Sequence, residues 1–436
     1  MSASLPVMAE RPSAVARLRA RLDREPGHVV ASFRALQEQQ RQRRVLFRDE
    51  LLPASIVPHF VDREVHQEWV RQLTQLFVDL EAIGADFLES PDLYDTLGLP
   101  DAARALIEID PGYDKLAIVS RLDMVWDGDR SYVYEINVDS PAMMTFTDYL
   151  EDIIRSLFPL QGLEDVDPMP HRRTTVLHDA LIECYQQWGG NKASPTIAIV
   201  DWRGQKTADE LVATANEFTK LGSPSFVCDP RDLKIVNRKL TCNGREIDIV
   251  QRRVLFPEFL QRPNEIATLV EAYRRGLICM ANPLRSYLLG NKCLLTLLSD
   301  ERGRSAVGRQ IVLPTVRVTP DNVNRFRQRE DWVLKGALGH GGHEVLLGVE
   351  QSDEAWAEAL DIAHRSLWVA QRYHRPPKLT VPIMTSDGIQ ERPLWANWNP
   401  FFFGGRFAGG MTRVSSEAIV SITANGALLP TLTTTP

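Results

Sequence analysis

Apolar residues in the first hundred positions recur at intervals of three or four, with charged residues between them. Residues 30–52 and 63–90 follow this pattern most closely. An α-helix completes a turn in about 3.6 residues, so this spacing gathers the apolar side chains on one face. We therefore predict a helical N-terminal region over residues 1–110. The basic run 41–44 is expected to be a solvated face of the first helix.

The pattern then changes to short runs rich in Val, Ile and Tyr. Residues 116–126 and 131–138 are two such runs, and the segment 127–129 (Asp-Gly-Asp) joins them. Asp-Gly between β-rich runs is a strong hairpin signal, because glycine accepts a positive φ. We predict a β-hairpin here, followed by a helix over 147–157.

Residues 161–280 alternate between strand-like and helix-like segments. Strand, helix and strand in that order indicate a small layered α/β domain with a mainly parallel sheet. The expected elements are strands at 195–202 and 225–229, helices at 207–222 and 263–276, and a hairpin around Asn243-Gly244.

The last third of the chain contains a glycine-rich loop between two strands. We expect a helix over 284–300, the two strands at 332–336 and 344–348, and then a further helix and a strand over 367–373. The remainder is rich in glycine and aromatic residues. The tail 426–436 (GALLPTLTTTP) is expected to be loosely ordered.

Composition is typical of a soluble globular protein. The 436 residues suit two or three subdomains, and 44% apolar with 25% charged residues excludes dominant disorder. A net charge of −7 argues against a nucleic-acid partner. No apolar run is long enough to span a membrane, and the N-terminus lacks the apolar stretch of a signal peptide. Five scattered cysteines without C-x-x-C favour a reducing cytoplasm over a disulfide framework or zinc ribbon.

The predicted hairpin carries a set of polar residues that could support chemistry. Arg121 and Asp123 are two apart on one strand, as are Glu135, Asn137 and Asp139 on the other, so each set shares one face. If the two faces coincide, carboxylates and an amide oxygen converge beside a guanidinium. Such hard oxygen ligands suit magnesium, and the arginine suits a transferring phosphoryl group. From spacing alone, a solvated surface hairpin with salt bridges is an equal alternative.

The glycine-rich loop, residues 335–342, is a second candidate. Glycines let backbone N–H groups approach phosphate oxygens, and Lys335 at the strand end can pair with their charge. The loop is neither a Walker A motif nor a dinucleotide fingerprint. His340 and His343 lack a third ligand nearby, so a zinc site is not expected. Lys292, within the predicted apolar helix, would by itself be expected to reach solvent.

Taken together, these motifs resemble the circularly permuted ATP-grasp ligases, the group that includes the synthetase domain of glutathionylspermidine synthase. The resemblance rests on five strings in order, RLDMVWDGDRSYVYEINVDSPA, NPLRSYLLGNKCLLTLL, WVLKGALGHGGHEVLLG, WVAQRY and GGRFAGGMTR, which span residues 121–413. It implies an α/β fold in which 111–160 is a metal-binding hairpin of the ATP-grasp core, 161–280 a pre-ATP-grasp α/β domain, and 281–436 the nucleotide-binding and lid region.

The resemblance also implies roles for individual residues. Gly336 departs from the family's usual proline and His340 from the arginine of the spermidine enzymes, so their substrate contacts do not carry over. The implied roles are catalysis for Arg121 and Arg413, metal binding for Asp123, Glu135 and Asn137, nucleotide binding for Lys292, Lys335, Gly339, His340, Gly341, Gly342, Gln371, Arg372 and Tyr373, and substrate contact for Asp139 and Ser140.

The implied activity is an ATP-dependent carboxylate–amine ligase that uses two Mg²⁺ ions. It would join a small acid to a small amine, through an acyl phosphate, into a peptide or γ-glutamyl type amide. Two alternatives stay open: a nucleotide-binding regulatory or scaffold relative without turnover, and a kinase that stops at phosphoryl transfer. A homodimer is also left open.

Overall fold

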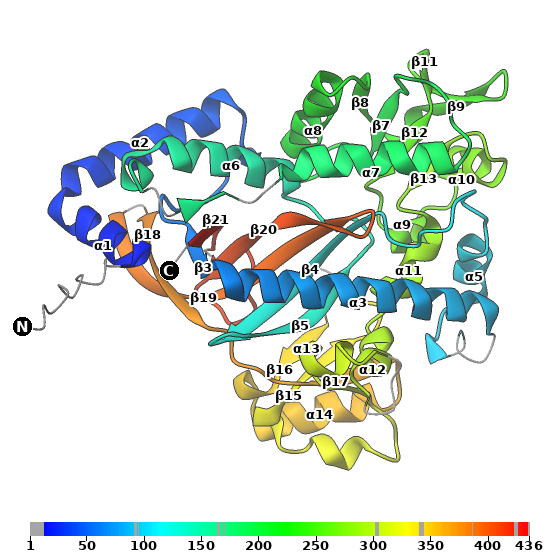
Figure 1. Cartoon of the computed structure of the whole chain (residues 1–436). Helices are drawn as coiled ribbons and strands as arrows, with labels where there is room; N and C mark the ends of the chain where they lie inside the picture. Colours follow the sequence, from blue (N-terminus) through cyan, green and yellow to red (C-terminus); the bar gives the residue numbers. More distant parts are fainter. Residues whose placement is uncertain are drawn as a thin grey trace, which may run out of the picture.

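The computed structural model describes residues 13–90, 94, 96–163, 166–168, 171–300, 305–339, 344–385, 387–422 and 426–434. Its largest sheet has eight strands and runs through the middle of the molecule (Figure 1). The main path is β3-β21-β20-β19-β4-β5, while β18 pairs with β19 and β6 with β21. These strands are β3 His59–Asp62, β4 Val119–Asp127, β5 Arg130–Asn137, β6 Val166–Asp167, β18 Lys378–Thr385, β19 Gly388–Phe403, β20 Arg406–Ser415 and β21 Ala427–Thr434.

Helix α3, Arg63–Glu89, covers one face of this sheet (Figure 1). The Asp62 carboxylate caps its first turn by accepting the next free N–H groups. Its apolar stripe packs on β19, where the rings of Phe77 and Phe402 lie 4.3 Å apart between centroids. The helix predicted over 63–90 is therefore confirmed, and its apolar spacing buries it against the sheet.

Helices α6, Met144–Ser156, and α7, Arg173–Gln187, cover the opposite face. Phe401 and Phe403 of β19 join their apolar cluster, whereas Phe402 belongs to the cluster under α3. Successive strand residues point to opposite faces, so the alternation of these phenylalanines assigns each face to its helices.

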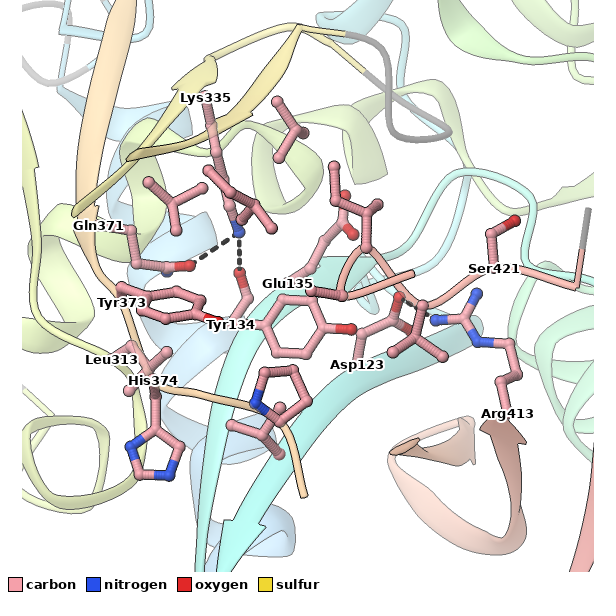
Figure 2. A pocket seen from close by; sticks show the side chains of 18 of the residues that line it. Asp123, Tyr134, Glu135, Leu313, Lys335, Gln371, Tyr373, His374, Arg413 and Ser421 are labelled. Atoms are coloured by element: carbon pink, nitrogen blue, oxygen red, sulfur yellow. Dashed lines mark hydrogen bonds and ion pairs between the residues drawn. The ribbon is translucent and has the colours of Figure 1, made fainter. Parts of the chain in front are cut away.

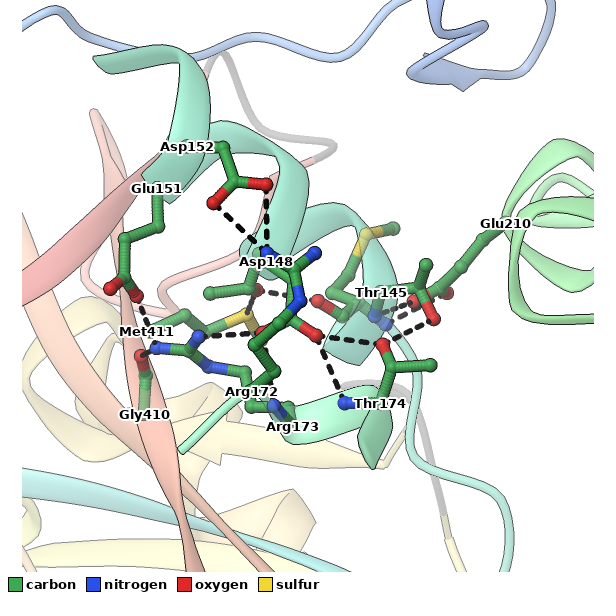
Figure 3. Close-up of polar contacts among 12 residues, drawn as sticks. Thr145, Asp148, Glu151, Asp152, Arg172, Arg173, Thr174, Glu210, Gly410 and Met411 are labelled. Carbon is green, nitrogen blue, oxygen red and sulfur yellow. Dashed lines mark hydrogen bonds and ion pairs between the residues drawn. The ribbon is translucent and has the colours of Figure 1, made fainter. Parts of the chain in front are cut away.

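A buried ion cluster fastens α6 and α7 to the sheet (Figure 3). The Arg173 guanidinium donates to Asp148 at 2.8 Å, to Glu151 at 2.9 Å and to the Gly410 carbonyl oxygen at 3.1 Å. Gly409 has φ +93°, and a Cβ there would lie only 3.2 Å from the Arg173 guanidinium. Glycine at this point thus lets β20 approach the buried charge.

A four-stranded parallel sheet, β13-β12-β7-β8, forms beside the large one, as predicted. Its strands are short and almost wholly apolar, which is typical of a parallel sheet covered on both faces. The hairpin at Asn243-Gly244 is also present, with both residues at positive φ. The elements of this part are β7 Ile197–Val200, α8 Ala208–Lys220, β8 Ser225–Cys228, β9 Leu233–Val236, β10 Lys239–Cys242, β11 Arg245–Ile247, β12 Ile249–Arg252, α9 Phe256–Gln261, α10 Ala267–Arg274 and β13 Cys279–Ala281.

A smaller antiparallel sheet, β14-β17-β15-β16, faces the β4–β5 hairpin from below in Figure 1. It has a separate small core around Phe326, Trp332 and Trp356. Its elements are α11 Tyr287–Gly290, α12 Cys293–Ser299, α13 Gly308–Ile311, β14 Thr315–Arg317, β15 Trp332–Gly336, β16 Val345–Leu347, α14 Asp353–Ala363 and β17 Trp368–Arg372. The N-terminal part adds α1 Ala14–Arg24, α2 Pro26–Gln42, the hairpin β1 Leu46–Phe47 and β2 Glu50–Leu51, and α5 Asp101–Ile107.

Three predictions about local structure are wrong. The helical pattern over residues 30–52 stops at Gln42, where α2 ends, and residues 46–51 form the hairpin of β1 and β2 instead. The helix expected over 284–300 breaks at Asn291, whose extended backbone separates α11 from α12. Its side chain accepts the Cys293 N–H at 2.9 Å and so caps α12, as asparagine often does in place of continuing a helix. The tail expected to be loose forms β21, which lies buried between β20 and β3. Its threonines suit a strand as well as a loop.

None of the helices in the described part of the chain is long and apolar enough to cross a bilayer.

We predict that Arg173→Met destabilises the protein by about 3–5 kcal/mol, because it leaves two carboxylates buried without their cation. Arg172→Met at the neighbouring position is a matched control. The ion pair of Arg172 with Asp152 is exposed, and such pairs contribute about 1 kcal/mol or less. Urea unfolding of both variants measures the difference. Equal decreases in the free energy of unfolding of the two variants would contradict a structural role for the cluster.

Candidate functional site

A cleft of about 530 Å³ lies between the β4–β5 hairpin and the small sheet (Figure 2). Most of the predicted site residues line it, although they are spread over almost three hundred positions. Those that line it are Arg121, Asp123, Glu135, Asn137, Lys292, Lys335, Gln371, Arg372, Tyr373 and Arg413.

Three strands of the large sheet, β4, β5 and β20, supply the polar floor of this cleft, and β19 lies between β4 and β20. Asp123 lies directly opposite Glu135 in the β4–β5 register, and Arg121 opposite Asn137. The next residues along β4, Leu122 and Met124, belong to the apolar cluster under α3. The two predicted faces of the hairpin therefore coincide, and they point away from α3 into the cleft.

Asp123 is the centre of this floor and is only 3% exposed. It accepts hydrogen bonds from Arg121 Nε at 3.0 Å, from Asn399 at 3.0 Å and from Arg413 at 2.7 Å. Burial alone would raise the pKa of Asp123, but the charges of Arg121 and Arg413 outweigh it and lower that pKa below its usual value. Asp123 is thus a permanent anion that orients two guanidinium groups.

Arg413 is held on its other side by asparagines of β19. Its Nε donates to Asn399 Oδ1 at 2.9 Å and lies 3.3 Å from Asn397 Oδ1. Burial alone would lower the pKa of Arg413, but the charge of Asp123 raises it. Both asparagines are completely buried, so this network has a fixed geometry.

A β-bulge next to Glu135 brings Tyr134 into the cleft as well. The register of β4 and β5 shifts so that Tyr134 is the extra residue between the pairs of Asp123 and Met124. Strict alternation would turn the Tyr134 side chain toward α3, but a bulge redirects it. Its hydroxyl accepts a hydrogen bond from Asn397, and its carbonyl oxygen is left to accept one from Lys335 at 3.0 Å.

Lys335 at the end of β15 faces the hairpin across the cleft (Figure 2). Its ammonium group donates to Gln371 Oε1 at 2.7 Å as well as to Tyr134. Burial lowers the pKa of Lys335 to about 8, with an opposing effect from Glu135 and a supporting one from Lys292. An anion in the cleft would stabilise its charged form.

Lys292 lies at the start of α12, where the predicted helix breaks, and is 5% exposed. It therefore does not reach solvent, as a lysine in an apolar helix would. Its ammonium group lies 3.8 Å from Glu135 Oε1 and donates to the Gly339 carbonyl oxygen. The helix break thus places a second cation in the cleft.

The end of β17 forms another wall. Gln371 is buried and donates to Thr315, while the Arg372 guanidinium lies 3.1 Å from Asp331. The Tyr373 N–H donates to the Asp331 carbonyl oxygen at 2.7 Å. Gly339 contacts Lys292 but does not line the cleft. His340, Gly341 and Gly342 lie outside the described residues.

Asp139 and Ser140, expected to contact substrate, are not among the residues that line the cleft. The Asp139 carboxylate instead accepts hydrogen bonds from Arg252 at 2.5 Å and from the Phe256 N–H at 2.7 Å. Because the Arg252 side chain is fully buried, this ion pair ties the end of β5 to the parallel sheet.

Part of the predicted metal set fits magnesium. Glu135 keeps a carboxylate 24% exposed, and Asn137 lines the cleft with an amide whose oxygen is a ligand type that magnesium accepts. Asp123 fits less well, since both of its oxygens already accept hydrogen bonds. Within the described ranges no three His, Cys, Asp or Glu side chains form a metal cluster. Phosphate oxygens would have to complete the coordination.

Several residues that line or support the cleft were not predicted from the sequence. Asn282 is buried and accepts the N–H groups of residues 118 and 119, so it clamps the start of β4. Asn397 and Asn399 share one face of an aromatic strand, and this spacing could have indicated them. Tyr134, Lys206 and Glu417 carried no sequence signal.

The model of the glutathionylspermidine synthase pre-ATP-grasp family matches residues 52–426. The chain belongs to this family. The family and the fold class predicted from the motifs, a mixed α/β protein with an ATP-grasp core, are thereby confirmed.

Among solved structures, a glutathione synthetase-like effector (GSS30) from Globodera pallida has the same fold, with a TM-score of 0.63 at 12% identity over 93% of this chain and 97% of that one. A putative γ-glutamylcysteine synthetase from Methylobacillus flagellatus KT has a TM-score of 0.39 at 10% identity, over 83% of this chain and 85% of that one. No curated protein matches the chain.

The lowered pKa of Lys335 predicts a pH dependence of nucleotide binding. Below pH 8 its ammonium is charged, and it loses its proton as the pH rises through about 8. One charge-assisted contact contributes about 1.5–3 kcal/mol, so ATP should bind roughly tenfold more weakly at pH 9.5 than at pH 7. Calorimetry at both values measures this.

Lys335→Met should bind ATP weakly at both pH values and show a flat profile. Lys234→Met, which alters an exposed lysine on β9, should keep the wild-type profile. If ATP affinity depends on pH in the same way in wild type and in Lys335→Met, Lys335 does not bind the nucleotide through its charge.

Proposed function

We propose that this protein is an ATP- and magnesium-dependent ligase that joins a carboxylic acid to an amine. The observation that carries this proposal is the excess of cations over carboxylates in one cleft, which favours a polyanion. Within the described residues, six cationic side chains line it against three carboxylates: Arg121, Lys206, Lys292, Lys335, Arg372 and Arg413 against Asp123, Glu135 and Glu417. A nucleoside triphosphate has the charge and the length to meet cations on both walls.

In this proposal different residues of the cleft bind the nucleotide and the magnesium ion. Lys335 and Lys292 bind phosphates of ATP, and Gln371, Arg372 and Tyr373 at the end of β17 face the base. Glu135 and Asn137 hold magnesium, which supplies positive charge at the phosphate oxygens when it is bound. The loop from Gly339 through His340, Gly341 and Gly342 would cover the phosphates. Asp139 and Ser140 would contact the substrate only after the end of β5 moves toward the cleft.

Arg121 and Arg413 would act on the transfer of the γ-phosphoryl group from ATP to the acid. The acid oxygen attacks the γ-phosphorus and ADP leaves, which gives an acyl phosphate. The amine nitrogen then attacks the acyl carbon, phosphate leaves, and the proton lost by the nitrogen goes with the phosphate. Negative charge grows on the phosphoryl oxygens during the first step, and guanidinium groups held rigidly by Asp123 are oriented to stabilise it. The fixed donors need no reorganisation during the reaction.

ADP release over a panel of acids and amines tests the proposal. A ligase releases ADP faster when both the acid and the amine are present, and the product has the mass of their amide. Release that depends on the acid but ignores the amine would instead indicate a kinase. No release with any pair would indicate a nucleotide-binding protein without turnover.

We predict that Arg121→Lys lowers turnover by something on the order of 10²-fold, while ATP affinity changes little. A guanidinium can donate to two phosphoryl oxygens at once, which an ammonium cannot. Lys292 and Lys335 still bind the nucleotide. Calorimetry and ADP release on one preparation measure the two effects. A rate that falls only in proportion to lost ATP binding would contradict a role in transfer.

Glu135→Gln should fold normally but require far more magnesium for turnover, because it loses a charged oxygen ligand and keeps its shape. The measurement is the magnesium dependence of ADP release at saturating ATP. Glu354→Gln on α14, an exposed position, is the matched control. An unchanged magnesium dependence in Glu135→Gln would show that this carboxylate holds no metal.

A further inference from the structure

Three strands of the small sheet contribute to the position of the Lys335 side chain. Thr315 of β14 lies directly opposite Gln371 of β17, and Lys335 of β15 lies diagonally across from Gln371 in the β15–β17 register. Opposite and diagonal positions on neighbouring strands share a face, so these three side chains are neighbours on the face toward the cleft. The alternate residues Leu334 and Ala370 belong to the small core on the other face.

The Lys335 ammonium group has three N–H donors, and the protein itself accepts two of them. One donates to Gln371 Oε1 at 2.7 Å and another to the Tyr134 carbonyl oxygen at 3.0 Å (Figure 2). Both acceptors are uncharged, so they fix the ammonium group without neutralising its charge. Its third N–H is then left for an anion in the cleft.

The first of these contacts depends on the orientation of the Gln371 amide. The oxygen and the NH₂ group of an amide have nearly the same shape, so shape alone permits two orientations. Only one of them offers the oxygen to Lys335, because the other turns N–H groups toward an ammonium group. Gln371 is 1% exposed, so water does not compensate for the wrong orientation. The position of Lys335 therefore depends on the group that selects between the two.

The Thr315 hydroxyl makes this selection. It donates its only proton to the Leu313 carbonyl oxygen at 2.8 Å, so it can only accept a hydrogen bond from Gln371. Gln371 Nε2 donates to it at 3.0 Å, which leaves Oε1 for Lys335. Thr315 is buried and is not among the described residues that line the cleft, so it acts on a ligand only through its neighbours.

Helix α12 holds Thr315 in place through the backbone. The Thr315 N–H donates to Ser299 Oγ at 3.0 Å, and the Ser299 hydroxyl donates to the Leu295 carbonyl oxygen at 2.8 Å. This helix starts directly after Lys292. The hydroxyl that orients Gln371 is thus fixed by the same helix that carries the second lysine of the cleft at its start.

We propose that Thr315 is a positioning residue for nucleotide binding, which directs the Lys335 ammonium group at the phosphates through the orientation of the Gln371 amide. Without the hydroxyl, the amide can adopt either orientation, and Lys335 loses one of its two fixed acceptors in the wrong one. This inference rests on the proposed binding of ATP by Lys335.

Calorimetry with ATP and magnesium measures the effect of the hydroxyl. Thr315→Val replaces it by a methyl group of similar size, and ATP should bind about tenfold more weakly. Thr315→Ser keeps the hydroxyl and should bind ATP like the wild type. Thr315→Ala and Thr315→Ser differ by one oxygen atom, so this pair repeats the comparison if valine disturbs the packing. Thr241→Val on β10, where the hydroxyl also donates to a backbone carbonyl oxygen, is the matched control and should leave ATP affinity unchanged.

A substitution at Gln371 separates orientation from packing. In Gln371→Glu both terminal atoms are oxygens, so either accepts from Lys335 and there is no orientation to select. The loss of ATP affinity caused by Thr315→Val should therefore disappear in the Gln371→Glu background. A packing role of Thr315 would weaken ATP binding equally in both backgrounds, and this result would overturn the inference.

The other outcomes distinguish this inference from the proposed function. ATP binding that neither Thr315→Val nor Thr315→Ala changes would overturn the positioning role alone. The predicted pattern of ATP binding without amide formation from any acid and amine would overturn the ligase function and leave the positioning role standing. A wild-type protein that binds no ATP would overturn both.

Discussion

The site is organised by one buried carboxylate held between two guanidinium groups. Asp123 lies in β4 and binds Arg121 of the same strand and Arg413 of β20, with Asn399 of β19 between them. A buried charge without a partner is strongly destabilising, so these three strands must meet in one register. In the β4–β5 register, Glu135 of β5 lies opposite Asp123. Residues far apart in the chain are thereby collected on one face of the sheet.

The parallel-sheet part holds this face in place from behind. The Asn282 side chain accepts and donates hydrogen bonds at the start of β4 and the end of β5, and Arg252 binds both the Asn282 carbonyl oxygen and Asp139. The small sheet then brings Lys335 and Lys292 to the open side. The result is a cleft with a rigid floor and two walls that come from different layers of the fold. This arrangement suits a ligand that must be aligned along its length.

Strand alternation predicted much of this arrangement, and its failures have physical causes. The β4–β5 hairpin, α3 and the parallel sheet follow directly from local patterns, because their apolar spacing matches their burial. Alternation could not predict Tyr134, since a bulge turns it into the cleft. The capping side chain of Asn291 interrupts an otherwise helical pattern and moves Lys292 inward. Strand β21 was missed because its burial depends on partners distant in sequence, and Lys206 and Glu417 meet the cleft only through the fold.

The most direct test of phosphoryl transfer to the acid follows an oxygen atom of the acid's carboxylate. If the acid carboxylate attacks the γ-phosphorus, one of its oxygens must leave with the phosphate. Turnover with an acid whose carboxylate carries oxygen-18 should therefore yield phosphate with one labelled oxygen, detected by mass spectrometry or by the phosphorus resonance. Phosphate that carries no label, or that takes its new oxygen from labelled water, would contradict transfer to the acid and with it the role given to the floor of the cleft.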